Sequence, residues 1–283
     1  MMNRNWYSNL GFGSLYLSTF LVVGFIAVIL WDLIYKGAPS WNWTFFSEGP
    51  QEGMTKGGIF PVIVGTFYVT LISTIASLPL GIGTAIYLQE YAPDNLLTRL
   101  IRSSIRNLAG VPSVIFGLFG LVLFVQHMQM GTSLLASGLT LGLLTLPTVV
   151  ASTEEALRNV PQSYREGALA LGATQWEVIW HQVLPAASSG IWTGAMLAIS
   201  RAAGETAPIL FTGVTFYQRF LPQSLFHEFM AMPYHIFILS TQHHAIEIVT
   251  PIAYGTALLL LVQILILQMI AFYLRYKQTS TRR

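Results

Sequence analysis

The chain has 283 residues, of which only 9% are charged and 53% are hydrophobic, and its formal net charge is +2. Because soluble domains carry about a quarter charged residues, this composition excludes an ordinary water-soluble domain. The sequence contains no cysteine, which excludes disulfides, thiol nucleophiles and cysteine-ligated metals.

Long uncharged stretches indicate how the chain is organised in a membrane. A transmembrane helix needs about 20 mostly apolar residues, and charges are absent from residues 5–31, 57–89, 107–153 and 248–274. Residues 178–218 form a further apolar run that only Arg201 and Glu205 interrupt. We therefore predict an all-α polytopic membrane protein with six transmembrane helices. The expected spans are Leu10–Ile34, Gly58–Leu88, Ile105–His127, Ser133–Thr153, Gly190–Thr212 and Ile248–Leu274.

The distribution of basic residues predicts the orientation of these spans. Six spans place both termini on the same side, and a cytoplasmic N-terminus leaves only Lys36, Lys56 and Arg219 outside. The positive-inside rule therefore predicts a multi-pass membrane protein with both termini cytoplasmic. The first apolar stretch is longer than the 7 to 15 residues of a signal peptide core, so we interpret it as a retained helix. Residues 1–57 are then this helix with a periplasmic loop.

The second span carries a row of hydroxyl side chains. Thr66, Thr70, Ser73 and Ser77 are spaced so that they share one face of a helix. Such hydroxyls could line the path of an oxyanion. Alternatively, they bond back to the carbonyl four residues earlier, as Ser and Thr often do in membrane helices.

The most polar part of the chain lies between the fourth and fifth spans, from Glu154 to Ala187. Pro161 can open a helix, and Gly172 can supply the left-handed position that ends it. Thr174 can cap a second short helix running to Pro185. The pattern predicts two short helices joined by a glycine turn on the cytoplasmic surface.

A charged pair interrupts the fifth span. Arg201 follows Gly190 by about 16 Å of helix, near the bilayer midplane, at a cost of about 2.5 to 3.5 kcal/mol on insertion scales. Glu205 follows at i+4 and can offset part of that cost. The pair is either a structural clamp between helices or an anion site. The planar guanidinium suits phosphate or sulfate because it can bind two oxygens at once.

Four motifs carry a resemblance to a known family. Glu166, Gly167, Ala168, Gly172, Leu184 and Pro185 fall where the EAA loop of ABC importer permeases, E-A-A-x3-G-x9-I-x-L-P, has its motif residues. Gly167 departs from it by standing for Ala, and Gln182 by standing for Ile. The stretches AIYLQEYAP, AGVPSVIFG and SRAAGETAP, at residues 85–93, 109–117 and 200–208, look like the PstA-type permeases of bacterial phosphate importers.

The resemblance implies a type I ABC importer permease (MetI-like) bundle over residues 58–283, with residues 154–187 as its coupling loop. The loop residues named above would then contact a separate ATP-binding subunit. The expected substrate pathway residues are Arg201, Glu205, Thr66, Thr70 and Ser73. The implied partners are a PstC-like permease forming a heterodimer, a PstB-like ATPase dimer, a PstS-like periplasmic phosphate-binding protein and membrane lipid, with no nucleic acid.

ATP hydrolysis is expected to take place on another subunit. The sequence contains no G-x-x-x-x-G-K-[ST] phosphate loop, so ATP and magnesium would be used by the partner ATPase and this chain would bind no cofactor. We thus expect a transport subunit and not an enzyme. Two alternatives stay open: an importer for sulfate, molybdate or phosphonate, and a gradient-driven secondary transporter in which Arg201 and Glu205 act as a relay.

Overall fold

The computed structural model describes residues 4–218 and 220–280, so that Arg219 lies outside the described residues. Within that part, five helices are long and apolar enough to cross a membrane, and a bent helix pair supplies a sixth crossing if it counts as one span. The structure confirms the all-α polytopic class. The five helices include α1 Arg4–Gly37, α3 Phe60–Ile86, α6 Leu134–Arg158, α9 Leu184–Gly204 and α12 Ile246–Ser280.

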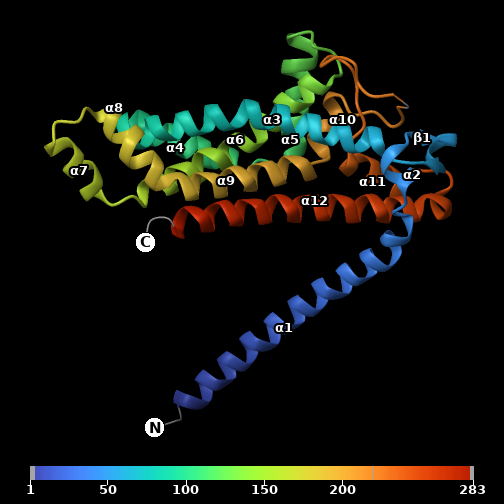
Figure 1. Ribbon diagram of the computed structural model, residues 1–283, viewed down its shortest axis with the longest axis horizontal. Helices are drawn as coiled ribbons and strands as arrows, with labels where there is room; N and C mark the ends of the chain where they lie inside the picture. Colours follow the sequence, from blue (N-terminus) through green and yellow to red (C-terminus); the bar gives the residue numbers. More distant parts are fainter. Residues whose placement is uncertain (1–3, 219, 281–283) are drawn as a thin grey trace.

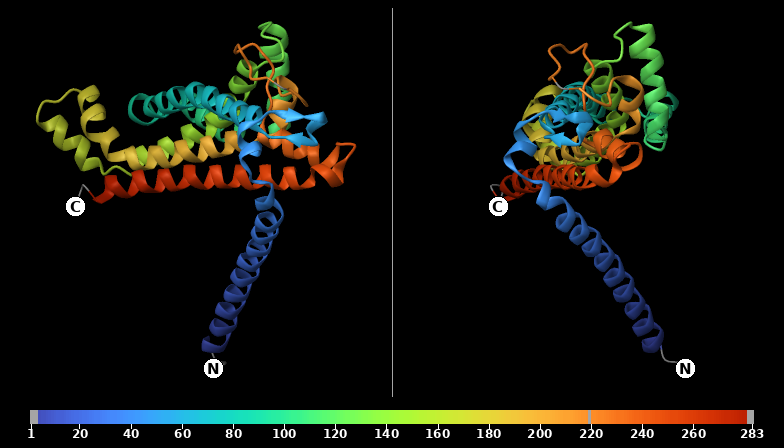
Figure 2. Two further views of the ribbon diagram at one scale, coloured as in Figure 1. Left: turned by 45° about the vertical axis from the view of Figure 1, so that its right-hand side comes forward. Right: turned by 90° about the vertical axis from the view of Figure 1, so that its right-hand side faces the viewer.

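Helices α3, α6, α9 and α12 lie side by side and form the bundle (Figure 1). Helix α1 leaves this bundle at an angle and meets α12 near its own C-terminal end (Figures 1 and 2). The start of α1 and the end of α12 lie at the same end of the molecule as α7 Gln162–Ala170. The division of the chain at residues 57 and 58 stays a prediction.

Small residues allow the bundle helices to pack closely. Gly138 and Gly142 of α6 lie against α3, where an added Cβ would come within 2.5 Å of Ile72 and 3.2 Å of Ala76. Gly194 of α9 lies against Ser152 of α6 in the same way. Glycine at these positions lets the helix backbones approach closely, as is common between membrane helices.

At the opposite end from α7, short elements form a cap over the bundle (Figure 1). These elements are a 3-10 turn Ala38–Ser40, α2 Trp43–Ser47, the antiparallel pair β1 Pro50–Gln51 and β2 Lys56–Gly57, a 3-10 turn Glu52–Met54 and α11 Met232–Thr241. Phe45 and Met54 are buried there against Met232 and Leu239. The loop predicted after the first span is therefore folded onto the protein.

The third span differs from the expected straight helix Ile105–His127. Helix α4 Leu96–Leu108 begins earlier, and after a break it turns by 103° into α5 Ser113–Gly120, which continues as a π-helical segment Leu121–His127. The break contains Gly110 and Pro112. Proline has no N–H for the helix ladder and disfavours helical conformation at the residue before it, which explains why the helix stops there.

The fifth span also differs from the prediction, Gly190–Thr212. The helix already begins with α8 Gln175–Val178, passes through a π-helical turn Ile179–Val183 and continues as α9 to Gly204. It breaks at Glu205, whose ψ of 132° is extended, before α10 Ala207–Thr212 begins. Pro208 lies in the first turn of α10, a position that proline favours because its missing N–H is not needed there.

Candidate functional site

In its N-terminal half, the loop between α6 and α9 has the local structure that the sequence predicts. Helix α7 follows Pro161, and Gly172 has a φ of +89°, in the left-handed region that glycine adopts readily. Thr174 then forms a capping box with Glu177, in which each side chain accepts a hydrogen bond from the other residue's backbone N–H. The glycine turn and the capped second helix are confirmed.

The second helix does not end at Pro185, contrary to the prediction. Pro185 lies in the first turn of α9, directly after the π-helical turn Ile179–Val183. Proline cannot donate to the carbonyl four residues earlier and would clash with it, and a π-helical turn is a common way to accommodate such an irregularity. The loop between α6 and α9 is thus continuous with the fifth span.

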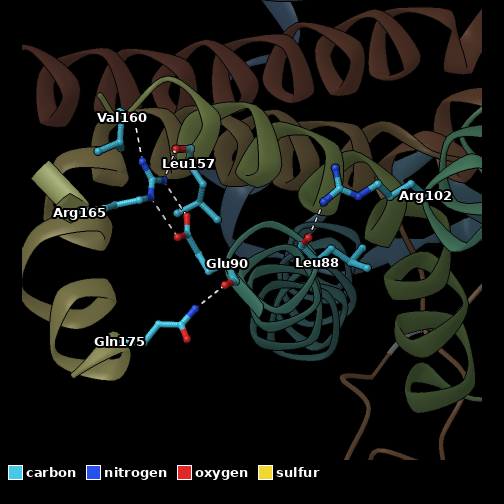
Figure 3. Close-up of polar contacts among 7 residues, drawn as sticks. All are labelled: Leu88, Glu90, Arg102, Leu157, Val160, Arg165 and Gln175. Carbon is cyan, nitrogen blue, oxygen red and sulfur yellow. Dashed lines mark hydrogen bonds and ion pairs between the residues drawn. The ribbon is translucent and has the colours of Figure 1, made fainter. Parts of the chain in front are cut away.

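A buried ion pair joins this loop to the π-helical segment Tyr87–Tyr91, which continues α3 at its C-terminal end. Arg165 of α7 donates from Nε to Oε2 of Glu90 at 3.0 Å and from Nη2 to Oε1 at 2.7 Å (Figure 3). The Arg165 and Glu90 side chains are 13% and 7% exposed. Arg165 also donates to the carbonyls of Val160 and Leu157, and Gln175 donates to the Glu90 carbonyl. The loop is therefore fixed to α3 at two points.

Arg165 therefore faces the bundle, although its neighbour Glu166 is exposed. Glu90 lies in one of the family-like stretches, but sequence reasoning gave it no role. Its only sequence signal was its place as the sole charged residue between Lys56 and Asp94. Arg102 of α4 makes a similar link nearby, donating to the Leu88 carbonyl (Figure 3).

The outward face of the loop is rich in exposed apolar and aromatic side chains. Exposed side chains of this kind are Tyr164, Leu169, Leu171, Trp176 and Trp180, with Leu171 at 91%. The two tryptophan rings stack with their centroids 5.6 Å apart. A contiguous apolar surface on a membrane protein's aqueous end is typical of a protein interaction site.

The loop residues singled out by sequence divide between the two faces. Glu166, Gly167, Gly172 and Pro185 are exposed, and a Cβ added at Gly167 would meet nothing within 4 Å. Ala168 and Leu184 are half-buried and pack against a cluster that consists of Leu157, Val160, Val178, Val183 and Ala187. The first group is accessible from outside this chain, whereas the second holds the loop against the bundle.

Arg201 and Glu205 form an ion pair in the fifth span, but the helix ends between them, whereas the sequence predicted that it continues through both. Arg201 donates from Nε to Oε1 of Glu205 at 3.1 Å, and their side chains are 36% and 19% exposed. Arg201 lies in the last turn of α9, and Glu205 follows the helix end and does not continue the same helical face. One residue before Arg201, Ser200 accepts a hydrogen bond from Gln268 of α12 at 2.9 Å. Part of the guanidinium stays free to meet an anion.

The two broken spans meet just beyond their breaks. An added Cβ at Gly117 of α5 would lie 3.1 Å from the Ala207 carbonyl oxygen and 3.0 Å from the Pro208 Cα. Helices α5 and α10 therefore cross at backbone contact, and a shift of one break must move the other. The family-like stretches 109–117 and 200–208 are brought together here.

The hydroxyls of α3 lie inside the chain. Thr66 donates to the Val62 carbonyl and accepts from the backbone N–H of Met232, both at 2.8 Å. Thr70 donates to the Thr66 carbonyl at 2.7 Å, whereas the buried Ser73 hydroxyl has no hydrogen-bond partner among the described residues. Ser77 is buried as well. The carbonyl-bonding alternative describes Thr66 and Thr70, and the pathway role of this row stays a prediction.

Within the described ranges, no group of three or more His, Cys, Asp or Glu residues lies close enough together to hold a metal ion.

Comparison with known proteins identifies the family. Residues 77–278 match the family described as "Binding-protein-dependent transport system inner membrane component". The chain belongs to this family. It is therefore a membrane-spanning transport component of an ABC importer and not an enzyme.

Relatives over most of the chain support this assignment. The "Probable ABC transporter permease protein YqgI" of Bacillus subtilis is 30% identical over 96% of both chains. The "Phosphate transport system permease protein PstA" of Haemophilus influenzae is 35% identical over 75% of both chains. The protein "PstA 1" of Mycobacterium tuberculosis is 34% identical over 94% of this chain and 87% of its own length.

Solved structures show the same fold. A bacterial ABC transporter involved in alginate import superposes with a TM-score of 0.68 at 14% identity, over 97% of this chain and 99% of its own. The MetNI methionine ABC transporter, in an inward-facing conformation, gives 0.62 at 16% identity, over 78% of this chain and 97% of its own. These likenesses confirm the MetI-like ABC importer permease fold predicted from the sequence.

Proposed function

We propose that this chain is the PstA-like permease subunit of an ATP-driven phosphate importer in the bacterial inner membrane. The observation that carries the proposal is the similarity to proteins named PstA, at 34% identity over 94% of the chain in one case. The Arg201 and Glu205 pair supports an anionic substrate, because a partly exposed guanidinium in a membrane span suits an oxyanion.

The proposed mechanism is alternating access driven by a separate ATPase. The outward face of the coupling loop, with Glu166, Gly167 and Gly172, would dock on a PstB-like ATPase dimer that uses ATP and magnesium. Ala168 and Leu184 would pass its movement into the fifth span, since α8 and α9 are continuous, and the exposed Pro185 would lie where the loop joins that span. Arg201 would thereby change the side of the membrane to which it is accessible.

The remaining partners follow from the same proposal. A PstC-like permease would complete the translocation path, and a PstS-like binding protein would deliver phosphate at the cap end of the bundle. Thr66, Thr70 and Ser73 are proposed to support the path from within α3. Both termini would be cytoplasmic, which agrees with the position of the start of α1 and the end of α12 at the α7 end (Figure 1).

Two other functions can be tested against this one. An importer of sulfate, molybdate or phosphonate would use the same architecture, whereas a gradient-driven carrier would have no use for a coupling loop tied to α3 by Arg165 and Glu90. Labelled phosphate uptake should be measured in cells that lack this chain, restored with wild type or with Arg201→Ala, with sulfate uptake measured beside it.

We expect wild type to restore phosphate uptake and Arg201→Ala to reduce it at least tenfold at equal membrane abundance. Full restoration by Arg201→Ala would make the pair a structural clamp. Restoration of sulfate uptake alone would keep the importer and overturn its substrate.

A further inference from the structure

Each broken span carries an arginine in the last helical turn before its break. In the fifth span this is Arg201, and in the third span it is Arg106, at the end of α4. Arg201 has Glu205 as its partner. Among the described residues Arg106 has no ion-pair partner, although Arg99 and Arg102 of the same helix each have one.

The packing of α4 places Arg106 within the length of the bundle. Its neighbour Ile105 packs against a buried cluster that contains Ala85 and Val150. Val150 precedes Thr153, the predicted end of the fourth span, by about 4.5 Å of helix. The Arg106 side chain is nevertheless exposed from this chain. The Arg106 guanidinium, which has no ion-pair partner among the described residues, thus lies near the cytoplasmic end of the bundle.

The two faces of α4 have different chemistry. Leu97, Leu100 and Ile101 are 66%, 56% and 39% exposed, which suits lipid or an apolar partner. Helical spacing puts Arg106 on a different side from these three residues. A charged side chain on a helix that packs against the spans is expected to face water or a polar partner, because exposure to hydrocarbon is costly. Arg106 therefore points away from the lipid-suited face.

The contact between α5 and α10 relates Arg106 to Arg201. Gly117 of α5 meets Ala207 and Pro208 of α10 beyond the two breaks, and in the chain each arginine precedes the helix that makes this contact. Helix α4 lies nearer the α7 end of the bundle than α10 does (Figure 1). Arg106 is thus on the α7 side of this junction, which the proposed orientation makes cytoplasmic.

We propose that Arg106 contacts the transported oxyanion on the cytoplasmic side of Arg201. This inference rests on the proposed function. An arginine without a carboxylate partner can donate two parallel N–H groups of its guanidinium to two oxygens of a phosphate, and no carboxylate offsets its charge. The phosphate of a lipid headgroup has the same chemistry, so the test must separate the two sources.

The first experiment measures phosphate uptake by proteoliposomes containing this chain with its partner subunits. Arg106→Gln is expected to lower the maximum rate at least tenfold, and Arg106→Lys, which keeps the charge but loses the two-point guanidinium contact, to give a rate between those of Arg106→Gln and wild type. Arg99→Gln is the matched control, because Arg99 is exposed and bound to Asp94, and it should behave as wild type. An Arg106→Gln rate equal to the wild-type rate would overturn the proposal.

The second experiment uses the absence of native cysteine. Arg106→Cys and Leu100→Cys each introduce a single thiol into this chain, which is treated from the cytoplasmic side with a charged, water-soluble thiol reagent. The thiol at position 106 should react at least tenfold faster, and inorganic phosphate should slow it. Equal rates at both positions would place Arg106 against lipid and overturn the proposal.

Lipid composition separates the two sources of phosphate. The uptake defect of Arg106→Gln should be the same in vesicles of phosphatidylcholine and in vesicles that also contain phosphatidylglycerol. A defect confined to the anionic vesicles would assign Arg106 to a lipid headgroup and overturn the proposal. If wild type carries no phosphate but another oxyanion, the proposed function fails, and the same variants measured with that anion decide the role of Arg106.

Discussion

Arg165 of α7 and Glu90 at the end of α3 form a two-point ion pair, although 75 residues separate them in the chain. Both side chains are largely buried, and removing one partner of a buried pair typically costs about 3 to 5 kcal/mol, because the other charge is left uncompensated. The pair therefore fixes the coupling loop to a bundle helix as well as to its own span.

Glu90→Gln should detach α7 from α3 while the spans stay folded. We expect ATP hydrolysis by the assembled complex to continue while phosphate uptake falls at least tenfold, which measures uncoupling. Lys56→Gln is a suitable control, because the pair of Lys56 with Glu52 is exposed and such pairs contribute about 0 to 1 kcal/mol. The double variant Glu90→Arg with Arg165→Glu should recover part of the uptake; coupled transport by Glu90→Gln itself would contradict this role.

Gly172 offers a test of the turn between α7 and α8. A Cβ added there meets nothing within 4 Å, so that a substitution acts only through the backbone, whose φ is +89°. Gly172→Val should cost about 1 to 3 kcal/mol, whereas Gly172→Asn should cost less because Asn tolerates the left-handed region. Protease sensitivity of the loop and uptake should both follow the order Gly, Asn, Val. Equal behaviour of Asn and Val would show that the turn does not depend on the left-handed conformation.

Local signals predicted this loop well because each acts over a few residues. Pro161, Gly172 and Thr174 have the roles that their chemistry favours, since a cap or a left-handed turn requires only neighbouring backbone groups. The pairing of Arg165 with Glu90 depends on tertiary contact, and no periodicity reports it. Hydropathy likewise located the spans but not their ends.

The two breaks show the same limit. Hydropathy averages over about 19 residues, so the short turn that contains Gly110 and Pro112 was absorbed into a single straight span. At Pro185 the error was the opposite one. The sequence predicted a helix end there, but the π-helical turn before it lets the helix continue. Proline marks a local irregularity, and the packing around it decides whether the chain bends or continues.

The Thr66 hydroxyl links α3 to the start of α11. Its role as a hydrogen-bond acceptor can be tested separately from its role as a donor. Thr66→Val keeps the shape but leaves the buried N–H of Met232 without an acceptor, which should lower stability by about 1 to 3 kcal/mol. Thr74→Val is matched to it, because Thr74 only donates to the Thr70 carbonyl, and it should change stability little. Thermal unfolding in detergent compares the two. A similar melting temperature for both would show that another group satisfies Met232.

His235 of α11 predicts how stability depends on pH. This helix lies outside the candidate membrane spans, and both ring nitrogens of the buried His235 have no hydrogen-bond partner among the described residues. Burial, assisted by the nearby His243, lowers the pKa of His235 from 6.5 to about 4. The unfolded chain then binds the proton more tightly than the folded protein. Stability is accordingly full above pH 6.5 and falls as the pH decreases toward 4.

At pH 5 this difference amounts to about 2 kcal/mol relative to pH 7.5. His235→Gln should remove that part of the pH dependence. The measured quantity is the change in stability between the two pH values within each variant, so an effect of the substitution at neutral pH does not affect the comparison. His181→Gln is the control, since His181 is exposed in the coupling loop and its removal should leave the pH dependence intact. Denaturant titrations of the purified chain at pH 7.5 and 5 measure both. If His235→Gln loses as much stability on acidification as wild type, the proton is taken up elsewhere and His235 is not the group that makes the cap sensitive to acid.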